Sequence, residues 1–264
     1  MSSLGVRVLF GGAELDVDGS VFKVYNPASI PRGGDRPYIY VNMAMTLDGK
    51  VHLGRPGYLL SGSPADRRSM AELRAAADAV MIGAGTLRTD NPVLGVNFED
   101  LREYRTAQGM GVEPLSVVVT ASGRIDENAR MFRTGFGRTV VLTCSQADKS
   151  RLSVLEARAE VLVVGDERVD LSEAVRVLGS EFGVARLLVE GGPGLVFNLL
   201  REHLVDEFFI TLVPVVKGGR DTLTLVEGEG FEYGKLPELD LVSVLEAGGE
   251  LFLRYRTKRE NQRQ

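Results

Sequence analysis

Residues 187–200 read LLVEGGPGLVFNLL, and their pattern indicates the fold class. Three apolar residues favour a buried strand, three glycines follow within four positions, and the apolar residues after them recur with the period of a helix. A strand, a glycine-bearing turn and a helix in this order form the repeating unit of a parallel α/β sheet. The stretch therefore predicts an α/β fold and places the glycines at the carboxyl end of a strand.

The same alternation recurs along most of the chain. The helix expected over residues 64–77 has a capping serine, Ser63, and a proline in its first turn. Met70, Leu73 and Ala77 share one face of that helix. Strands are expected over residues 38–43, 79–82, 115–119, 139–142, 161–164 and 187–189, and further helices over 150–158, 171–182 and 195–203.

The pattern changes after residue 203, where strands are expected without helices between them. These strands cover residues 207–216, 241–245 and 250–255, and an Ala-Gly-Gly turn joins the last two as a hairpin. We therefore expect a mostly parallel central sheet flanked by helices, with antiparallel C-terminal strands. The expected organisation is an N-terminal extension (1–36) packed on the domain, one main domain (37–257) and a polar tail (258–264).

Composition excludes several classes of protein. The chain has 264 residues, 44% of them hydrophobic, and its net charge of −5 argues against a broad nucleic-acid surface. The single cysteine, Cys144, excludes an internal disulfide and a zinc site built on several cysteines. The only histidines, His52 and His203, lie about 150 residues apart, so a HExxH site is absent too. No signal peptide is visible and no apolar stretch approaches the ~20 residues that span a bilayer, so we expect a cytoplasmic protein without a membrane partner.

Two loops at expected strand ends carry polar residues that suit a ligand. In NMAMTLDGKV (residues 42–51), an Asp-Gly turn exposes Lys50, and the alternative is an ordinary strand-to-loop turn. In GAGTLRTDNPVL (83–94), glycines allow close backbone approach, threonines add hydroxyls, and Asp-Asn-Pro forms a stiff polar turn. Arg88 stands where a GxGxxG fingerprint has its third glycine, so this loop is not that fingerprint.

Two more loops complete the set. In VEGGPGLVFNLL (189–200), unpaired N–H groups and the positive helix end suit a pyrophosphate, and the alternative is a helix-capping turn without a ligand. Glu190 beside such an anion fits sugar hydroxyls better than a phosphate. VTASGRID (119–126) could hold a ribose phosphate, or be a solvated turn. All four loops follow expected parallel strands, so we expect them to gather at the carboxyl edge of one sheet. Their glycines, hydroxyls and few ionisable groups suit a dinucleotide better than hydrolysis.

The chain resembles the pyrimidine reductases of riboflavin biosynthesis in five segments, which read in this order AMTLDGK, LRAAADAVMIGAGTLRTDNPVL, VTASGRID, LLVEGGPGL and LVDEFFITLVPVVKGG. The resemblance covers residues 38–256 and implies the dihydrofolate reductase fold and a homodimer through the C-terminal strands. It implies an NADPH-dependent enzyme that converts the ribosylamino side chain of a pyrimidine 5′-phosphate to ribitylamino. Hydride would reach C1′ of the ring-opened imine, oriented by Lys50 or Glu190.

The resemblance also implies roles for individual residues. NADPH is expected to contact Ala44, Thr46, Asp48, Gly83, Thr86, Asp90, Thr120, Ser122, Gly123, Arg124, Gly191, Gly192, Gly194 and Leu195. The substrate is expected to contact Asn42, Ser61, Arg74, Leu94 and Glu190. Glu190 would bind the ribose hydroxyls and Arg74 the phosphate, while the alternatives for Arg74 are pairing with Glu72 or Asp78, or solvation. Arg124 would suit the 2′-phosphate of NADPH. No metal is expected.

Departures from the family pattern bear on the substrate. Bacterial members usually have a phosphate-binding arginine after the DNP turn. This chain has Asn97 near that place, within an apparent insertion, and Arg102 or Arg105 could substitute for the arginine. At residue 42, where bifunctional members often have a lysine, this chain has an asparagine. In this it resembles the archaeal stand-alone reductases, which act before deamination. Bifunctional members carry a zinc deaminase domain that residues 1–36 are too short to hold, so we expect a stand-alone reductase.

Two other functions stay open on the sequence alone. One is a dihydrofolate or pterin reductase of the same fold, which the missing arginine favours. The other is a noncatalytic sensor that binds NADPH, which predicts cofactor binding without oxidation. The DNP turn and Arg74 favour the riboflavin interpretation.

Overall fold

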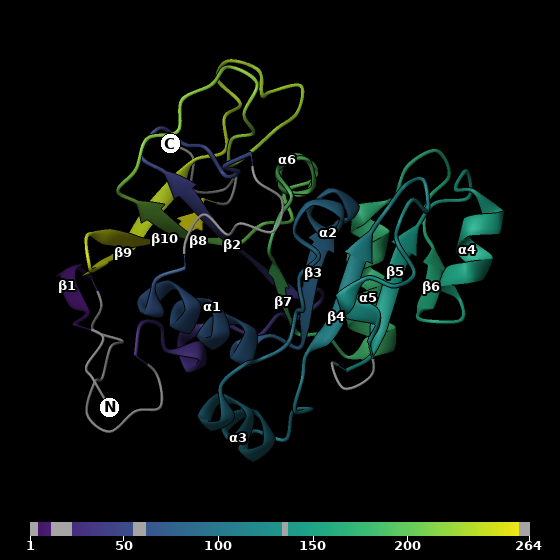
Figure 1. Cartoon of the computed structure of the whole chain (residues 1–264), viewed down its shortest axis with the longest axis horizontal. Helices are drawn as coiled ribbons and strands as arrows, with labels where there is room; N and C mark the ends of the chain where they lie inside the picture. Colours follow the sequence, from purple (N-terminus) through teal and green to yellow (C-terminus); the bar gives the residue numbers. More distant parts are fainter. Residues whose placement is uncertain (1–4, 12–22, 55–61, 134–136, 259–264) are drawn as a thin grey trace.

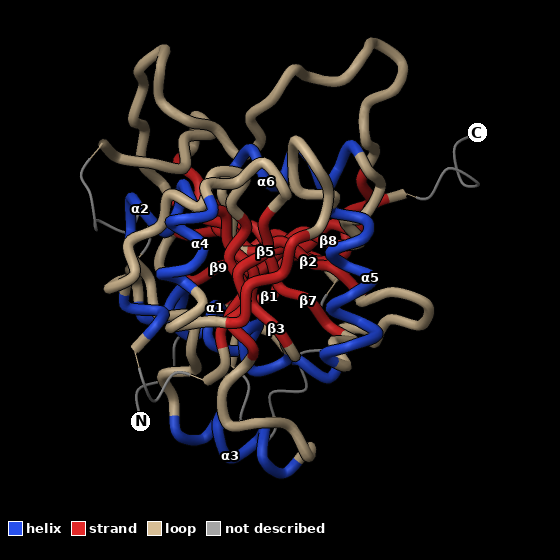
Figure 2. The backbone as a smooth tube through the Cα atoms, turned by 90° about the vertical axis from the view of Figure 1, so that its right-hand side faces the viewer, coloured by secondary structure: helices blue, strands red, loops and turns tan. Residues whose placement is uncertain are grey.

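The computed structural model describes residues 5–11, 23–54, 62–133 and 137–258, and these form one ten-stranded sheet with helices on both faces (Figures 1 and 2). The strands are β1 (Arg7–Phe10), β2 (Tyr38–Thr46), β3 (Ala79–Gly83), β4 (Leu115–Val119), β5 (Thr139–Thr143), β6 (Glu160–Val163), β7 (Arg186–Val189), β8 (Glu207–Val213), β9 (Leu239–Ala247) and β10 (Glu250–Thr257). The α-helices are α1 (Pro64–Ala76), α2 (Ala84–Asp90), α3 (Glu99–Ala107), α4 (Lys149–Leu155), α5 (Leu171–Phe182) and α6 (Pro193–Arg201), with short 3₁₀ turns η1 (Pro27–Ser29) and η2 (Arg130–Phe132).

The sheet order is β1-β9-β10-β8-β2-β7-β3-β4-β5-β6. Neighbours from β8 to β6 are parallel, and those from β8 to β1 are antiparallel. The expected mostly parallel sheet with antiparallel C-terminal strands is confirmed. The direction changes after β8, because β8 follows the crossover helix α6, whereas a tight turn joins β9 to β10.

Alternate side chains of the central strands enter two apolar layers. Val80 and Ile82 of β3 pack on the face covered by α1, α2 and α4, while Met81 between them packs on the face covered by α5 and α6. Since both faces are covered, the parallel strands are continuous apolar runs in the sequence. None of the helices in the described part of the chain is both long enough and apolar enough to cross a bilayer.

Helix α1 is held at both ends and along its buried face. The hydroxyl of Ser63 accepts a hydrogen bond from the Asp66 N–H, so the predicted cap is confirmed, although the helix ends one residue early, at Ala76. The buried Glu72 carboxylate accepts from Arg68 and from the backbone N–H groups of residues 23–25. These contacts hold the segment of residues 23–25 against α1.

Three elements differ from the sequence-based expectation. Residues 84–90 form helix α2, where we expected only a polar loop, and Asn91 ends it in the left-handed conformation with φ 45°. The apparent insertion after the DNP turn contains helix α3. Residues 7–10 form β1, which pairs with β9 at the sheet edge. Smaller differences are α4, which ends at residue 155 rather than 158, and α6, which begins at residue 193 rather than 195.

Candidate active site

A cavity of about 760 Å³ opens at the carboxyl ends of β2, β3 and β7. Its walls come from α1, α2, the turn before α6 and the loop of residues 214–238 that links β8 to β9. Eleven residues expected to bind cofactor or substrate line it: Asn42, Ala44, Arg74, Gly83, Thr86, Asp90, Glu190, Gly191, Gly192, Gly194 and Leu195. Three of the four loops singled out in the sequence therefore meet at one site.

The glycine turn before α6 packs directly on the start of α2. The Gly83 N–H donates to the Gly191 carbonyl, and the Gly191–Gly192 peptide is cis. A Cβ on Gly192 would lie 3.0 Å from the Thr86 hydroxyl, and Gly191 has φ 83°. Side chains larger than hydrogen would fill this part of the cavity, so the turn leaves bare backbone beside the N-terminus of α6, a place that suits the phosphates of a dinucleotide.

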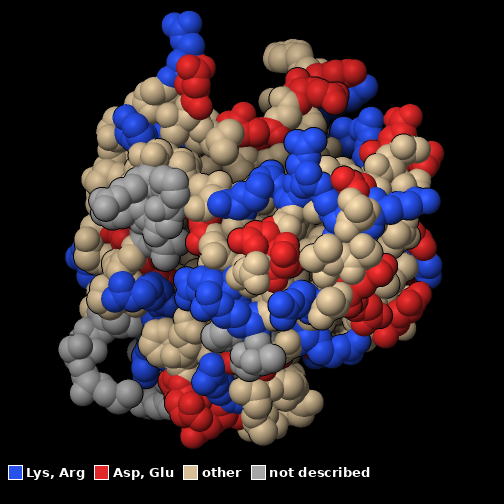
Figure 3. Space-filling model, turned by 45° about the vertical axis from the view of Figure 1, so that its right-hand side comes forward, with Lys and Arg blue, Asp and Glu red and all other residues tan. Residues whose placement is uncertain are grey.

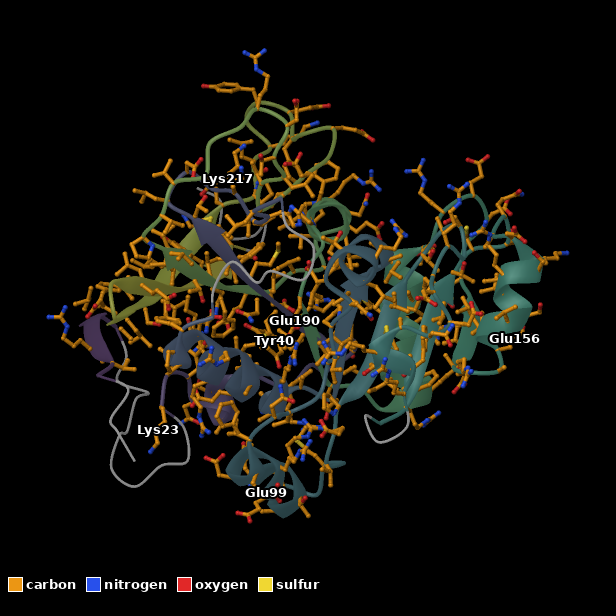
Figure 4. The ribbon with its side chains drawn as sticks, viewed as in Figure 1. Lys23, Tyr40, Glu99, Glu156, Glu190 and Lys217 are labelled. Carbon is orange, nitrogen blue, oxygen red and sulfur yellow. The ribbon has the colours of Figure 1, made fainter. Side chains whose placement is uncertain are left out.

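Glu190 and Arg74 form a buried ion pair on the cavity wall. Both carboxylate oxygens accept from the guanidinium at 2.7 Å, and Nη1 of Arg74 donates to the carbonyls of Val93 (3.0 Å) and Gly95 (2.9 Å). The exposed fraction is 4% for the Arg74 side chain and 11% for that of Glu190. Figure 4 shows Glu190 at the centre of the molecule. Burial opposes the charge of Arg74, but Glu190 outweighs it and raises the pKa of the guanidinium.

The ion pair with Glu190 contradicts the alternatives stated for Arg74, which were pairing with Glu72 or Asp78 and exposure to solvent. Glu72 is occupied by Arg68 and the N-terminal backbone, and Asp78 accepts from the N–H groups of residues 185 and 186. Arg74 is neither paired with them nor solvated. Its charge is instead opposed by Glu190, the residue expected to bind the ribose.

The segment after β2 holds the 214–238 loop. The Asp48 carboxylate accepts from the Thr46 hydroxyl (2.6 Å) and from the N–H groups of Lys217 (2.9 Å) and Gly218 (2.7 Å). These hydrogen bonds, that of Thr46 first, lower the pKa of Asp48 to about 2. Figure 4 shows Lys217 near the carboxyl end of β2. Thr46 and Asp48 therefore lie behind the cavity wall, where they anchor the loop.

The prediction that the turn exposes Lys50 is wrong. The residue is half-buried, and its ammonium group donates to the Thr222 carbonyl at 3.0 Å. The next residue, Val51, donates its N–H to the Leu223 carbonyl. Lys50 lies outside the cavity lining, whereas Leu223 and Glu227 of the same loop line it. The turn exposes no lysine because the loop covers it.

The remaining expected residues also lie outside the lining. Leu94 is 1% exposed within the core. Thr120, Ser122 and Gly123 form a tight turn after β4, in which the Thr120 hydroxyl accepts from the Gly123 N–H, and the exposed Arg124 follows it. The Arg88 guanidinium donates to the Arg124 carbonyl at 3.1 Å. Ser61 falls outside the described residues.

Neither arginine suggested as a substitute near Asn97 reaches the cavity. Arg105 is 1% exposed and donates to the carbonyls of Arg74, Ala75 and Ala77 at the end of α1. Arg102 pairs with Glu113 at 2.7 Å. Both side chains stabilise the backbone around α3.

Sequence reasoning missed much of the wall. The lining residues that it did not assign are Met43, Val51, His52, Asp66, Arg67, Met70, Ile82, Gly85, Thr89, Pro92, Val93, Asn97, Arg130, Pro193, Leu223 and Glu227. The helical period could have found two of these, because Arg67 and Met70 precede Arg74 by seven and four positions on one face of α1. The 214–238 loop has no periodic signal.

A family model of the RibD C-terminal domain matches residues 37–253. The chain belongs to this family. Its relatives include a 2,5-diamino-6-ribosylamino-4(3H)-pyrimidinone 5′-phosphate reductase of Archaeoglobus fulgidus, 40% identical over 74% of this chain and 89% of that protein. A protein of the same name from Methanothermobacter thermautotrophicus is 36% identical over 84% of this chain and 99% of that protein.

Other RibD-family members are longer or more distant. The chain spans about half of the riboflavin biosynthesis protein RibD of Bacillus amyloliquefaciens, with 26% identity over 82% of this chain and 56% of that protein. Among solved structures, a pyrimidine reductase-like protein of Corynebacterium diphtheriae superposes with a TM-score of 0.74 at 22% identity, over 85% of this chain and 93% of that one. The structural comparison shows the expected dihydrofolate reductase-like fold.

Asp48→Asn is expected to loosen the 214–238 loop. The amide carries no charge to hold the N–H groups of Lys217 and Gly218, so their hydrogen-exchange protection factors should fall. Because the pKa of Asp48 lies below its usual value, the wild-type contribution is complete above pH ~4 and is lost as the pH falls through about 2. Glu202→Gln, which alters a carboxylate bonded to Ser172, is the control. Unchanged protection at both amides would show that Asp48 does not anchor the loop.

Proposed function

We propose that the chain reduces the ribosylamino side chain of 2,5-diamino-6-ribosylamino-4(3H)-pyrimidinone 5′-phosphate to a ribitylamino group, with NADPH as the reductant. One observation carries this proposal. Glu190, fixed by Arg74, lies directly before the glycine turn, so an acceptor for sugar hydroxyls adjoins a cradle for a dinucleotide. The relatives named for this substrate support the proposal. Asn42 supports it too, because this asparagine lines the cavity and is the residue in which the chain resembles the archaeal stand-alone reductases.

In this mechanism the protein acts mainly by positioning the substrate relative to the cofactor. The Glu190 carboxylate accepts hydrogen bonds from the ribose hydroxyls and fixes the C1′ imine of the ring-opened substrate. Met43, Val51 and Met70 supply an apolar part of the cavity wall. NADPH supplies the hydride when it is bound, and the geometry must bring donor and acceptor carbons to ~3–3.5 Å. Lys50 acts from behind the wall by holding the 214–238 loop.

The test is the decay of NADPH absorbance with three substrates in parallel. The diamino ribosylaminopyrimidinone phosphate is expected to be turned over faster than its deaminated counterpart, and dihydrofolate is not expected to react. Turnover of dihydrofolate alone would assign a pterin reductase of the same fold. Tight NADPH binding without any turnover would assign a sensor.

Arg124→Ala is expected to raise the KM for NADPH about tenfold and to leave the KM for NADH unchanged. The proposal places the exposed Arg124, with Arg88 beside it, on the cofactor's 2′-phosphate, and a charge-assisted hydrogen bond contributes about 1.5–3 kcal/mol. Steady-state kinetics with both cofactors measures the ratio. Arg176→Ala, which removes an exposed arginine on α5, is the control. An equal rise in both KM values would contradict the role in selectivity.

The proposal includes a homodimer formed through the antiparallel end of the sheet. Strand β1 lies at that edge and exposes about half of the surface of Val8, Leu9 and Phe10. An edge strand presents unpaired backbone N–H and C=O groups with which another chain can pair, and exposed apolar patches mark interaction sites. Light scattering should give twice the chain mass of 28.7 kDa, whereas a monomeric mass would contradict this part.

A further inference from the structure

Helix α3 and the chain that follows it border the part of the cavity wall formed by residues 93–97. Val93 and Asn97 of this segment line the cavity, while Val96 packs with Leu101 of α3 in a small core between α1 and α3. Figure 1 places α3 at the lower end of the molecule, and Figure 3 shows acidic and basic side chains close together at that end. The exposed side of α3 is therefore charged, and its buried side packs against the wall.

Glu113, in the connection from α3 to β4, holds this segment by its backbone. Its Oε2 accepts a hydrogen bond from the Val96 N–H at 2.6 Å, and its Oε1 accepts one from Nη2 of Arg102 at 2.7 Å. The side chain of Glu113 is 7% exposed. Hydrogen bonds to an ionised acceptor are about twice as strong as those between neutral groups. The carboxylate therefore fixes the backbone at residue 96, and Arg102 fixes the carboxylate.

Gly95 leaves the room that this carboxylate occupies. A Cβ on Gly95 would lie 2.7 Å from Oε2 of Glu113 and 3.2 Å from its Cδ. Nonbonded carbon and oxygen atoms do not approach as closely as the first of these distances, so a side chain at residue 95 would push the carboxylate away from the Val96 N–H. The contact between Glu113 and Val96 therefore depends on the glycine that precedes the valine.

The ion pair of the active site holds the same segment from its other side. Arg74 donates to the Gly95 carbonyl at 2.9 Å, and the same guanidinium holds both oxygens of Glu190 at 2.7 Å. Arg105 of α3 supports this arrangement, because it donates to three carbonyls at the end of α1. A displacement of the segment would therefore reach Glu190 through Arg74.

We propose that Glu113 is a positioning residue of this active site, which holds residues 93–97 and, through Arg74, keeps Glu190 in place for the substrate. Glu113 lies outside the cavity lining and acts only through the segment. This inference rests on the proposed function for the substrate that it concerns. It gives the apparent insertion after the DNP turn a role at the site, because α3 supplies Arg102, the partner of Glu113.

Hydrogen exchange on the full chain tests whether Glu113 holds the segment. In Glu113→Ala the protection factor of the Val96 amide is expected to fall about 10- to 100-fold relative to the amides of β3, because a hydrogen bond to a charged group is lost. Gly95→Ala should cause a similar fall, and the double variant should be no worse than Glu113→Ala alone, since the clash is gone. Glu202→Gln, which alters a carboxylate bonded to Ser172, is the control. Unchanged protection at Val96, or additive losses in the double variant, would contradict the contact.

Substrate affinity then separates positioning from a purely structural role. Glu113→Gln, the milder variant, should weaken binding of the diamino ribosylaminopyrimidinone phosphate in calorimetry about tenfold and raise its KM by the same factor, while the NADPH dissociation constant stays as in wild type. A smaller folded fraction alone would lower kcat and leave all of these constants unchanged. Unchanged substrate affinity in a variant that has lost protection at Val96 would overturn the positioning role. A wild type that binds this compound but oxidises no NADPH would overturn the proposed function, while the same titration still decides the role of Glu113.

Discussion

Replacing Arg74 by alanine is expected to lower the free energy of unfolding by about 3–5 kcal/mol, because the change leaves a buried carboxylate without its partner. Glu190 would lose both of its 2.7 Å hydrogen bonds, and the carbonyls of Val93 and Gly95 would lose their donor. Urea denaturation followed by circular dichroism measures the effect. Arg67→Ala is the matched control on the same helix, and its exposed side chain predicts a change within about 0.5 kcal/mol.

A double variant separates the ion pair from the packing of the arginine stem. Combining Arg74→Ala with Glu190→Gln removes the orphaned charge, so the loss should be smaller than the sum of the two single losses. The unpaired carbonyls of Val93 and Gly95 would remain in both backgrounds. Strictly additive losses would mean that the pair contributes nothing beyond the separate side chains, and Arg74 would then act only through the turn of residues 93–95.

The sheet could be predicted from the sequence because its strands are buried on both faces. Residues 115–119 and 171–182 were expected as a strand and a helix with the bounds that the structure has. Helix α2 could not be predicted in the same way, since only Ala84 and Leu87 are buried in it and glycine and threonine are weak helix formers. Its position on the sheet, rather than its own propensity, forms the helix.

The site could be predicted only where its residues follow strands. The glycine and hydroxyl loops were found because parallel strands bring their carboxyl ends together. The Arg74–Glu190 pair joins residues 116 positions apart, and the contact of Asp48 with Lys217 joins residues 169 positions apart. No local pattern tells which carboxylate an arginine meets across such a distance. The long-range polar contacts, which decide whether a charge is available to a ligand, therefore needed the structure.

Glu190→Gln is expected to lower kcat/KM for the ribosylaminopyrimidine by about 10- to 100-fold. The amide removes a charged acceptor for the ribose hydroxyls, and hydrogen bonds to charged groups contribute about 1.5–3 kcal/mol each. It also leaves Arg74 as an unbalanced cation on the wall. Initial rates at saturating NADPH measure the loss. Glu202→Gln, a carboxylate beyond the far end of α6, is the control and should behave as wild type.

The NADPH dissociation constant of the same variant decides what Glu190 acts upon. If the carboxylate holds only the sugar, fluorescence titration should give an NADPH affinity equal to that of wild type, because the glycine turn that follows Glu190 binds through its backbone. Lost turnover with unchanged NADPH affinity would assign Glu190 to the substrate. A parallel loss of NADPH affinity would instead place the ion pair in the cofactor site, and unchanged turnover would remove Glu190 from the reaction altogether. Only the first result fits a carboxylate that Arg74 holds ready for a ribose.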